Sequence, residues 1–412
     1  MSKRNLVTLL VAFFLCHFQM TVGNPITKNM NSGGYERSYQ LYEPASLDET
    51  TGVMLCLHGL GGSSSNFFDL GIKSIADELN MIIVAPQALP EKDENTLTEM
   101  NKLPESLRAS IPLTAVWGAG LYIDATLKLG MFTQTLKAEL NAGIDDVTFL
   151  KAVLTEVTNQ YSGINKKRIY IFGISLGGFM SYQYAASHSD ELAALISVSG
   201  SMGTHIKNKT GAKPLTICDF HSVDDDVVPY AGTITMSGTP TIQASLCDNK
   251  EDVIKFWNQL NHPTACTPET YSFPDANGKK VTKYTYSRPG EKDVIHYKIN
   301  GTNHTYYFAK SAGDAMDYND ELVAFIRAND AKALGIENLY AEKMHIYPNP
   351  AHDIINLPIQ TGKIVIYDLV GKIALSGNID NSTFNVSSLP KGTYVVKLLT
   401  EGTVHAVKLQ VE

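Results

Sequence analysis

Five short apolar runs, each with little alternation between apolar and polar residues, most constrain how this chain of 412 residues can fold. Strands with such a pattern are buried on both faces, as in a parallel sheet covered by helices. The runs lie at residues 53–57, 81–85, 168–172, 193–198 and 215–220. In the amphipathic stretches between and after them, helices are predicted over residues 66–79, 147–161, 176–187 and 250–260. The alternation predicts an α/β domain with a doubly wound, mostly parallel sheet, whose sites lie at the carboxyl ends of the strands.

The N-terminus departs from this pattern. Lys3 and Arg4 precede an apolar stretch over residues 6–18, and small residues follow up to Gly23. This is the composition of a signal peptide, here residues 1–23. The apolar stretch is shorter than the roughly 20 residues of a spanning helix, and no later stretch is long and apolar enough to cross a membrane. The mature chain is therefore predicted to be exported, with no transmembrane segment.

The C-terminal region loses the helical pattern. A last helix is predicted over residues 317–328, so that the α/β domain spans residues 24–330 and a polar linker follows at 331–343. Residues 344–412 alternate or cluster residues that favour strands, with glycine and proline at the turns. The strands are predicted at residues 363–369, 382–386, 393–399 and 404–411. This region is expected to form a small all-β sandwich.

The sequence G-I-S-L-G at residues 173–177 directly follows a predicted strand and opens a predicted helix. A serine in this context lies on a tight turn, a nucleophile elbow, which exposes its hydroxyl at the N-terminus of the helix. The turn is so tight that the residues two before and two after the serine must be small, which explains Gly173 and Gly177. Ser175 is therefore the predicted catalytic nucleophile.

A serine nucleophile needs a base and an acid that orients the base, and in this fold they follow in the order Ser, Asp or Glu, His. Three acids at residues 224–226 come after the strand at 215–220, and each of them is well placed. Two of the three are expected to be solvated or to bind a cation. His304 lies in a loop rich in glycine and asparagine, after a strand predicted at 294–299, and is the predicted base.

The oxyanion hole is expected to consist of backbone N–H groups. Leu176, which follows the nucleophile, supplies one of them. Leu60, in the glycine-rich loop at residues 58–63, is assigned as the second donor. A phosphate-binding loop would need Gly-Lys-Ser/Thr, which this loop lacks. His58 is expected to brace the loop rather than to act as an acid or base.

Together these motifs resemble a family of secreted serine esterases with the α/β-hydrolase fold, which includes feruloyl esterases and polyhydroxybutyrate-depolymerase-like proteins. The resemblance covers roughly residues 35–330. Its segments are L-H-G at 57–59, D-D-V-T-F-L at 145–150, G-I-S-L-G-G at 173–178, H-S-V-D-D-D-V-V-P-Y at 221–230 and G-T-N-H-T at 301–305. It implies that Asp225 is the catalytic acid and again selects His304 as the base. Leu176 and Tyr306 differ from the residues frequent in the family, which leaves the substrate open.

Two residues are candidates for the substrate pocket. Tyr306 follows the predicted base, and Trp117 lies in residues 101–143. For Trp117, ordinary core packing beneath a loop is an equally open interpretation. Residues 101–143 show no strand pattern and are expected to form loops and short helices over the sheet, and the sequence leaves open whether they act as a lid.

Residues 344–412 resemble the sorting domain of proteins that Bacteroidetes export by type IX secretion. The matching segments are Y-P-N-P-A at 347–351, I-Y-D at 366–368 and L-P-K-G-T-Y at 389–394. The resemblance implies that the type IX secretion machinery is a partner and that the protein is secreted or attached to the cell surface. A carbohydrate-binding module is the competing interpretation, and the lack of tryptophan in this region counts against it.

Cysteine content and charge restrict the other possibilities. Cys247 and Cys266 flank a predicted helix, and the sequence leaves open whether they form a disulfide in an oxidising compartment. No spacing resembles a metal site, so neither a metal nor another cofactor is expected. The net charge of -8 argues against a nucleic-acid partner.

The sequence therefore predicts an exported carboxylic ester hydrolase that acts on an extracellular polymer. The expected substrates are feruloyl or acetyl esters of plant polysaccharide, with an aliphatic polyester such as a polyhydroxyalkanoate as the alternative. An inactive hydrolase scaffold that serves as a surface-binding protein is a less favoured hypothesis, because the set of Ser, Asp and His is intact. A peptidase would need features that grip a peptide terminus or backbone, and none is recognisable.

Overall fold

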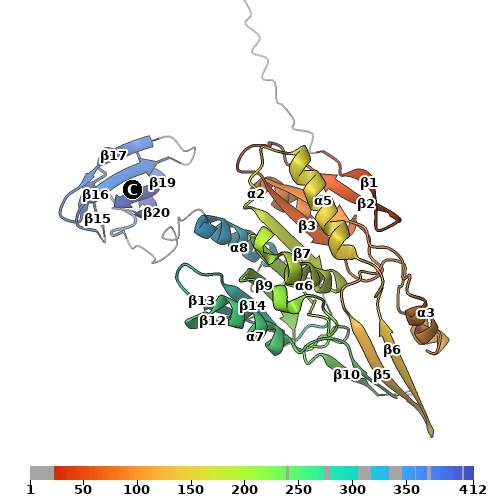
Figure 1. Ribbon diagram of the computed structural model, residues 1–412. Coiled ribbons are helices and arrows are strands. Elements are labelled where there is room, and N and C mark those ends of the chain that lie inside the picture. The colour runs from red at the N-terminus through yellow and green to blue at the C-terminus, as the bar shows by residue number, and fades with distance from the viewer. Residues whose placement is uncertain are drawn as a thin grey trace, which may run out of the picture.

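The computed structural model describes residues 23–237, 241–272, 279–304, 317–333, 346–357, 359–368, 373–400 and 403–412 (Figure 1). The predicted signal peptide lies outside these residues except for its last position, and so does most of the predicted linker. Among the helices of the described residues, none combines the length and the apolar character that a membrane span needs.

A ten-stranded sheet forms the centre of the first domain. Its strands, in spatial order, are β1 (Ile26–Ser32), β2 (Tyr35–Tyr42), β4 (Met81–Pro86), β3 (Gly52–Leu57), β7 (Ile169–Ile174), β8 (Ala194–Val198), β9 (Thr216–Ser222), β14 (Val294–Asn300), β13 (Lys280–Ser287) and β12 (Ala265–Ser272). The strands from β4 to β14 are parallel, and two antiparallel strands complete each edge. The five apolar runs form β3, β4, β7, β8 and β9, in which every residue is buried. The predicted mostly parallel α/β fold is confirmed.

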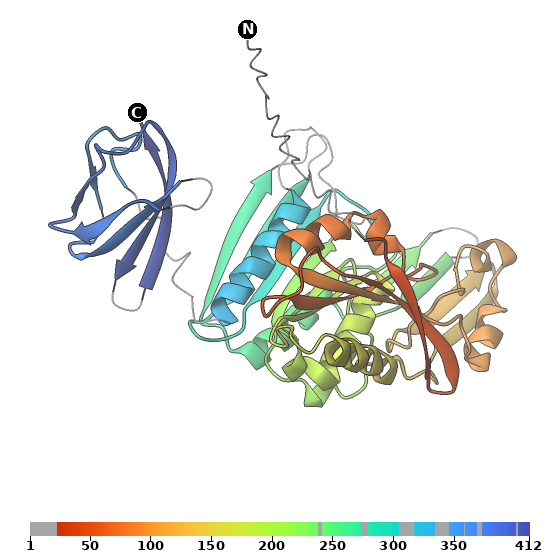
Figure 2. The same cartoon turned by 90° about the horizontal axis from the view of Figure 1, so that it is seen from above.

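Helices cover both faces of this sheet (Figure 2). One face packs against α5 (Asp146–Gln160), α6 (Leu176–His188) and α7 (Lys250–Asn261), which bury Phe149, Phe179 and Trp257 in one core. The other face packs against α1 (Asn66–Asp69), α2 (Ile72–Leu79) and α8 (Tyr318–Ala333), which contribute to a second core. The helix predicted over residues 66–79 is two helices, because Gly71 adopts a φ of +87° between them.

A second, antiparallel sheet stands beside the central one. Its strands, in spatial order, are β10 (Thr233–Met236), β11 (Thr241–Ser245), β5 (Tyr122–Leu129) and β6 (Phe132–Glu139). The expectation of loops and short helices over residues 101–143 is therefore wrong for residues 122–139, which form the hairpin of β5 and β6. The only helix within residues 101–143 is the single turn α4 (Glu105–Arg108), and α3 (Glu94–Met100) precedes the segment. The apolar positions of β5 do alternate, but alanine and threonine weaken the pattern.

The C-terminal residues form two small sheets around a core of their own, as the prediction of an all-β unit requires. One sheet pairs β15 (Ile354–Asn356) with β18 (Thr383–Asn385). The other contains β17 (Ile373–Ile379), β16 (Gly362–Tyr367), β19 (Gly392–Thr400) and β20 (Thr403–Val411), in that order. Fully buried residues such as Ile364, Val396 and Leu409 fill the space between the sheets.

Candidate active site

Ser175 lies on the turn between β7 and α6, at the carboxyl end of a central strand. Its backbone has a φ of 53° and a ψ of -123°, a strained conformation for a residue other than glycine. A Cβ atom on Gly173 would lie 2.0 Å from the carbonyl oxygen of Gly177, and one on Gly177 would lie 1.9 Å from that of Leu57. Both positions therefore require glycine, and the turn is a nucleophile elbow.

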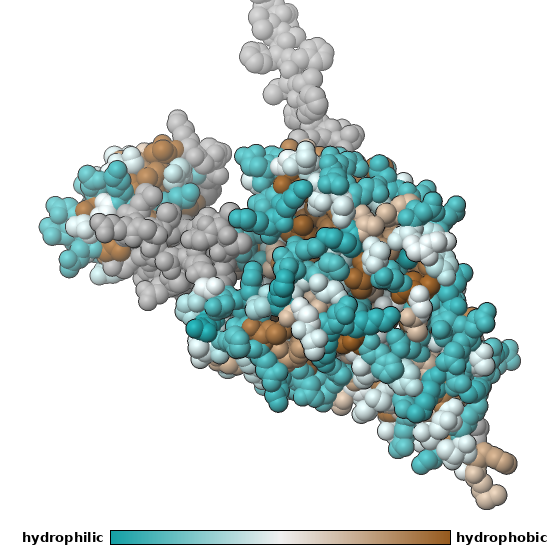
Figure 3. Space-filling view, in the orientation of Figure 1, coloured by the Kyte–Doolittle hydropathy of each residue, from teal (hydrophilic) through white to brown (hydrophobic). Residues whose placement is uncertain are grey.

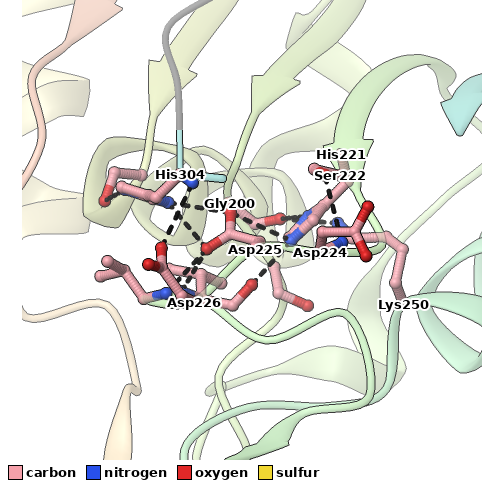
Figure 4. Close-up of polar contacts among 12 residues, drawn as sticks. Gly200, His221, Ser222, Asp224, Asp225, Asp226, Lys250 and His304 are labelled. Carbon is pink, nitrogen blue, oxygen red and sulfur yellow. Dashed lines mark hydrogen bonds and ion pairs between the residues drawn. The ribbon is translucent and has the colours of Figure 1, made fainter. Parts of the chain in front are cut away.

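Three residues predicted from separate segments meet at this turn. His304 Nε2 lies 3.0 Å from Ser175 Oγ. On the other side of the ring, His304 Nδ1 lies 2.8 Å from Oδ2 and 3.1 Å from Oδ1 of Asp225 (Figure 4). The arrangement places a hydroxyl, an imidazole and a carboxylate in one hydrogen-bonded series, the geometry in which a serine is activated as a nucleophile.

The carboxylate of Asp225 is buried and firmly held. Its Oδ1 accepts hydrogen bonds from the backbone N–H groups of Val227, at 2.9 Å, and Val228, at 2.7 Å. Burial raises the pKa of Asp225, but the hydrogen bond and charge of His304 and the charge of His221 outweigh it, so that the net pKa lies below the ordinary value. The carboxylate of Asp225 is therefore ionised at every pH at which a histidine is neutral and can act as a base.

The two neighbouring acids bind the loop that carries His304. Asp224 Oδ2 accepts a hydrogen bond from the backbone N–H of Gly301 at 2.7 Å. Asp226 Oδ1 accepts a longer one, of 3.4 Å, from the backbone N–H of His304. Asp224 and Asp226 are exposed, as expected for the two acids other than the catalytic one, and their hydrogen bonds to the loop at 301–304 are a role that the sequence did not indicate.

His221 is a further residue of the site for which the sequence suggested no role. Its ring is fully buried, with Nδ1 3.0 Å from the carbonyl oxygen of Gly200 and Nε2 2.8 Å from that of Val228 (Figure 4). Nε2 also lies 3.6 Å from Oδ2 of Asp225. The ring thus joins the loop after β8 to the loop that carries Asp225. The signals in the sequence were its position at a strand end, four residues before that acid, and its place at the start of the resembling segment at 221–230.

Leu60 and Leu176, the predicted oxyanion donors, belong to two separate segments of the chain. Leu176 is the first residue of α6, where a backbone N–H has no acceptor within the helix. Leu60 lies in the loop after β3. The N–H groups of Gly61 and Gly62 in that loop donate to the carbonyl oxygens of Ala115 and Gly59, so neither is available to a substrate.

A cavity of about 460 Å³ opens at Ser175 and His304. Leu60 and Leu176 also line it, whereas Trp117 does not. Trp117 is fully buried, and its Nε1 donates a hydrogen bond of 2.9 Å to the carbonyl oxygen of His58. The pocket interpretation of Trp117 is therefore wrong, and the residue braces the loop from inside the core. Tyr306 lies outside the described residues.

His58 is neutral and structural. Burial lowers its pKa to about 4, although the hydrogen bond to the carbonyl oxygen of Gly59 opposes this effect. Its Nε2 accepts a hydrogen bond from the backbone N–H of Ala88.

The structure does not form the disulfide that the sequence left open. Cys247 is buried and Cys266 is exposed, and both thiols are free. Cys247 lies before the N-terminus of α7 and Cys266 after its C-terminus. A helix of twelve residues is about 18 Å long, whereas the Cα atoms of a disulfide are less than about 7 Å apart. Within the described residues, no group of three or more His, Cys, Asp or Glu side chains is arranged to hold a metal ion.

Comparisons with known proteins agree with this architecture. Residues 127–262 match the family Phospholipase/Carboxylesterase, and residues 345–412 match the family Secretion system C-terminal sorting domain. The chain is 25% identical over 185 residues to the bifunctional acetylxylan esterase/xylanase XynS20E of Neocallimastix patriciarum, a match that covers 43% of this chain and 23% of that protein. It is 29% identical over 167 residues to feruloyl esterase B of Piromyces equi, with 39% of this chain and 29% of that protein covered. The chain thus spans less than a third of the length of these relatives.

A solved structure, an acetyl xylan esterase from Aspergillus awamori, aligns with 73% of this chain and 99% of its own, at 12% identity and a TM-score of 0.45. The ferulic acid esterase AmCE1/Fae1A from Anaeromyces mucronatus, solved with ferulic acid, aligns with 74% of this chain and 88% of its own, at 13% identity and a TM-score of 0.41. The family matches thus relate part of the α/β domain, residues 127–262, to the phospholipase/carboxylesterase family, and residues 345–412 to secretion system C-terminal sorting domains.

Proposed function

We propose that this protein is an exported serine esterase that hydrolyses carboxylic esters with Ser175, His304 and Asp225 as its catalytic triad. The observation that carries the proposal is the hydrogen-bonded series from Ser175 Oγ through His304 to Asp225. It stands on an elbow that only glycines permit, beside a cavity that can hold a substrate.

In the first half of the reaction, Ser175 Oγ attacks the ester carbonyl while His304 Nε2 takes the hydroxyl proton. Asp225 stabilises the imidazolium that forms. The backbone N–H groups of Leu176 and Leu60 donate to the oxyanion of the tetrahedral intermediate. His304 then gives the proton to the departing alcohol, which leaves an acyl group on Ser175.

In the second half, water replaces the alcohol. His304 takes a proton from the water as it attacks the acyl carbon, and returns it to Ser175 Oγ when the acid leaves. The triad thus ends in its starting protonation state. This proposed route is complete with the side chains and amides of the chain itself and uses no cofactor.

The class of polymer that carries the ester is proposed from the names of the curated relatives. The names of two of them specify acetylxylan and feruloyl esters, which favours an ester-bearing polysaccharide over a polyester as the substrate. The C-terminal domain favours export by the type IX machinery, to the medium or to the cell surface. The polyester alternative has no support among the curated relatives reported above.

The test is hydrolysis of p-nitrophenyl butyrate by the full chain. Ser175→Ala and His304→Ala are each expected to lower kcat by about 10⁴-fold or more, because members of a triad act as a unit. The matched control is Ser74→Ala, since Ser74 is exposed on α2, on the far face of the sheet. Equal activity of Ser175→Ala and the unmodified protein would refute the triad, and binding of polysaccharide without any hydrolysis would favour the inactive scaffold.

A further inference from the structure

The part of the chain that the structure describes gives the cavity beside Ser175 an almost entirely aliphatic lining. Of the described residues that line it, four have polar side chains: Ser110, Ser175, Asp226 and His304. Ser175 and His304 are the reacting groups, while Ser110 and Asp226 are exposed and therefore lie toward solvent. The other described lining residues are leucine, isoleucine, valine, methionine, alanine and proline, with Phe179 as the only aromatic side chain among them.

One wall of the cavity is a face of the second sheet. Ile123, Ala125 and Leu127 of β5 line it, and so do Ile242 and Ala244 of β11. Register places Ala125 beside Ala244 and Leu127 beside Ile242, so these side chains lie on one face of the paired strands. The intervening positions of both strands point to the opposite face. The sheet is therefore amphipathic, and its apolar face is turned toward the serine.

Further lining residues come from the segment between β4 and β5. Met100, Leu103, Leu107 and Ile111 project into the cavity from α3, α4 and the turns around them. The surface of this domain in Figure 3 is mostly hydrophilic, with its apolar residues in small separate groups. An apolar cavity of this size is thus a distinct feature of the fold, in the volume range of small-molecule sites.

The size and chemistry of this space restrict the acyl group. A water-sized group occupies roughly 30 Å³, so that a cavity of about 460 Å³ accommodates on the order of ten carbon-sized groups. An acetyl group would leave most of it empty. A hydroxycinnamoyl group would fill more of it but would bring a phenolic hydroxyl among the aliphatic side chains of the described lining residues, and a buried polar group is unfavourable where such side chains offer it no partner.

We propose that the acyl group this site accepts is an aliphatic chain of medium length. This inference rests on the esterase activity proposed above, but it assigns the site an acyl group other than the acetyl and feruloyl groups that the names of the relatives specify. The acyl chain lies along the apolar face of β5 and β11 and the lining residues from α3 and α4, with its carbonyl group at Ser175. Each methylene that it buries adds apolar contact, and the polymer or alcohol side of the ester remains toward the exposed mouth near Asp226.

The experiment measures kcat/KM of the full chain for p-nitrophenyl acetate, butyrate, octanoate and laurate, which share one leaving group. The expected result is a rise of about fourfold per buried methylene from acetate toward octanoate. Methyl octanoate is expected to be a better substrate than methyl ferulate in the same assay.

Two substitutions at neighbouring positions of β11 test whether the preference for a longer acyl chain arises from the cavity. Ala244→Phe fills the cavity from its wall and is expected to lower the octanoate-to-acetate ratio of kcat/KM by tenfold or more. Gln243→Phe adds the same ring at the next position, which is exposed on the other face of the strand, and is expected to leave the ratio unchanged.

The outcomes separate the two proposals. No hydrolysis of any ester would refute the esterase activity itself. Hydrolysis with acetate preferred over octanoate, or with methyl ferulate preferred over methyl octanoate, would leave the esterase standing and overturn the aliphatic acyl site. An equal loss of the ratio in Gln243→Phe and Ala244→Phe would also overturn it, because the preference would then not arise from the cavity face.

Discussion

At the scale of single residues, the side chains that position the triad matter as much as its members. His221 touches neither substrate nor Ser175, yet its ring lies between the carbonyl oxygens of Gly200 and Val228. Val228 is also one of the two residues whose N–H groups hold Asp225. A shift of His221 therefore moves the acid and, through it, the imidazole.

His221→Ala is expected to lower kcat by about 10²-fold, with little change of KM, because a misplacement of about 1 Å is enough for such a loss. Esterase kinetics measure the split between kcat and KM, and circular dichroism confirms that the variant is folded. His262→Asn is the control, since His262 is exposed and its φ of 50° is one that asparagine tolerates. A proportional loss of folded protein and activity would show that His221 is only structural.

A buried ion pair lies behind the site. Lys250 Nζ and Asp219 Oδ1 are 2.8 Å apart with both side chains fully buried, and Asp219 Oδ2 is 2.9 Å from His296 Nδ1. Burial raises the pKa of Asp219, but the charges of Lys250 and His296 outweigh it, so that its net pKa lies well below the ordinary value. Because the pKa of Asp219 is lower in the folded than in the unfolded protein, its ionised carboxylate stabilises the fold fully above about pH 4. This contribution to the free energy of unfolding is lost as the pH falls below that value.

Lys250→Met is expected to lower the free energy of unfolding at pH 7 by about 3–5 kcal/mol, because it leaves the carboxylate of Asp219 buried with fewer partners. The difference from the unmodified protein should shrink below about pH 4, where Asp219 in the variant is protonated. Urea unfolding at several pH values measures it. Lys298→Met, which breaks an exposed pair with Glu251, is the control and should cost less than about 1 kcal/mol. A difference that is constant with pH would contradict this account.

At the scale of elements, the elbow depends on close approach between β7, α6 and the loop after β3. Gly177→Ala is expected to lower the free energy of unfolding by about 3 kcal/mol and to abolish activity, because the new Cβ would overlap the backbone of Leu57. Chemical denaturation and ester hydrolysis measure both effects. Gly163→Ala is the control, since a Cβ there meets nothing within 4 Å. Native stability of Gly177→Ala would mean that the two backbones separate easily.

The elements that the sequence predicts are those whose burial leaves a clear pattern. β3, β4, β7, β8 and β9 are buried on both faces, so apolar residues fill them without alternation. The antiparallel strand β13 and the strands of the second sheet are only partly buried. Residues such as Thr126 and Ala138 weaken the alternation of the second sheet. Pattern alone therefore missed β5 and β6, and with them the wall of the cavity.

The residues of the candidate site likewise fall into those that the sequence predicts and those that it does not. Ser175 and His304 follow from local motifs, since an elbow and a loop after a strand are legible in sequence. The choice of Asp225 among residues 224–226 depends on which carboxylate reaches the ring, and only the family resemblance made it in advance. The contacts of His221 join segments that lie far apart in sequence, so that no local pattern could reveal them.

At the scale of the whole molecule, the first domain and the C-terminal residues have separate cores. Calorimetry of the full chain is therefore expected to show two unfolding transitions. Ile364→Ala, at a fully buried position, should destabilise the C-terminal unit by about 2–5 kcal/mol while ester hydrolysis stays unchanged. Leu195→Ala, at a buried position of β8, should shift the other transition instead. A single transition that both substitutions shift equally would show that the two units unfold together.

The second sheet also has a consequence for how the chain folds. β11 pairs with β5 in a register that joins Thr241 to Lys128, so this ladder closes a loop of more than a hundred residues. β7, β8 and β9 pair over much shorter separations. Because loop-closure entropy must be overcome before distant contacts contribute, such pairings form slowly. A refolding chain should therefore pass through a species in which β7, β8 and β9 are paired while its acyl site is still open to water, and catalytic competence is the last property that it acquires.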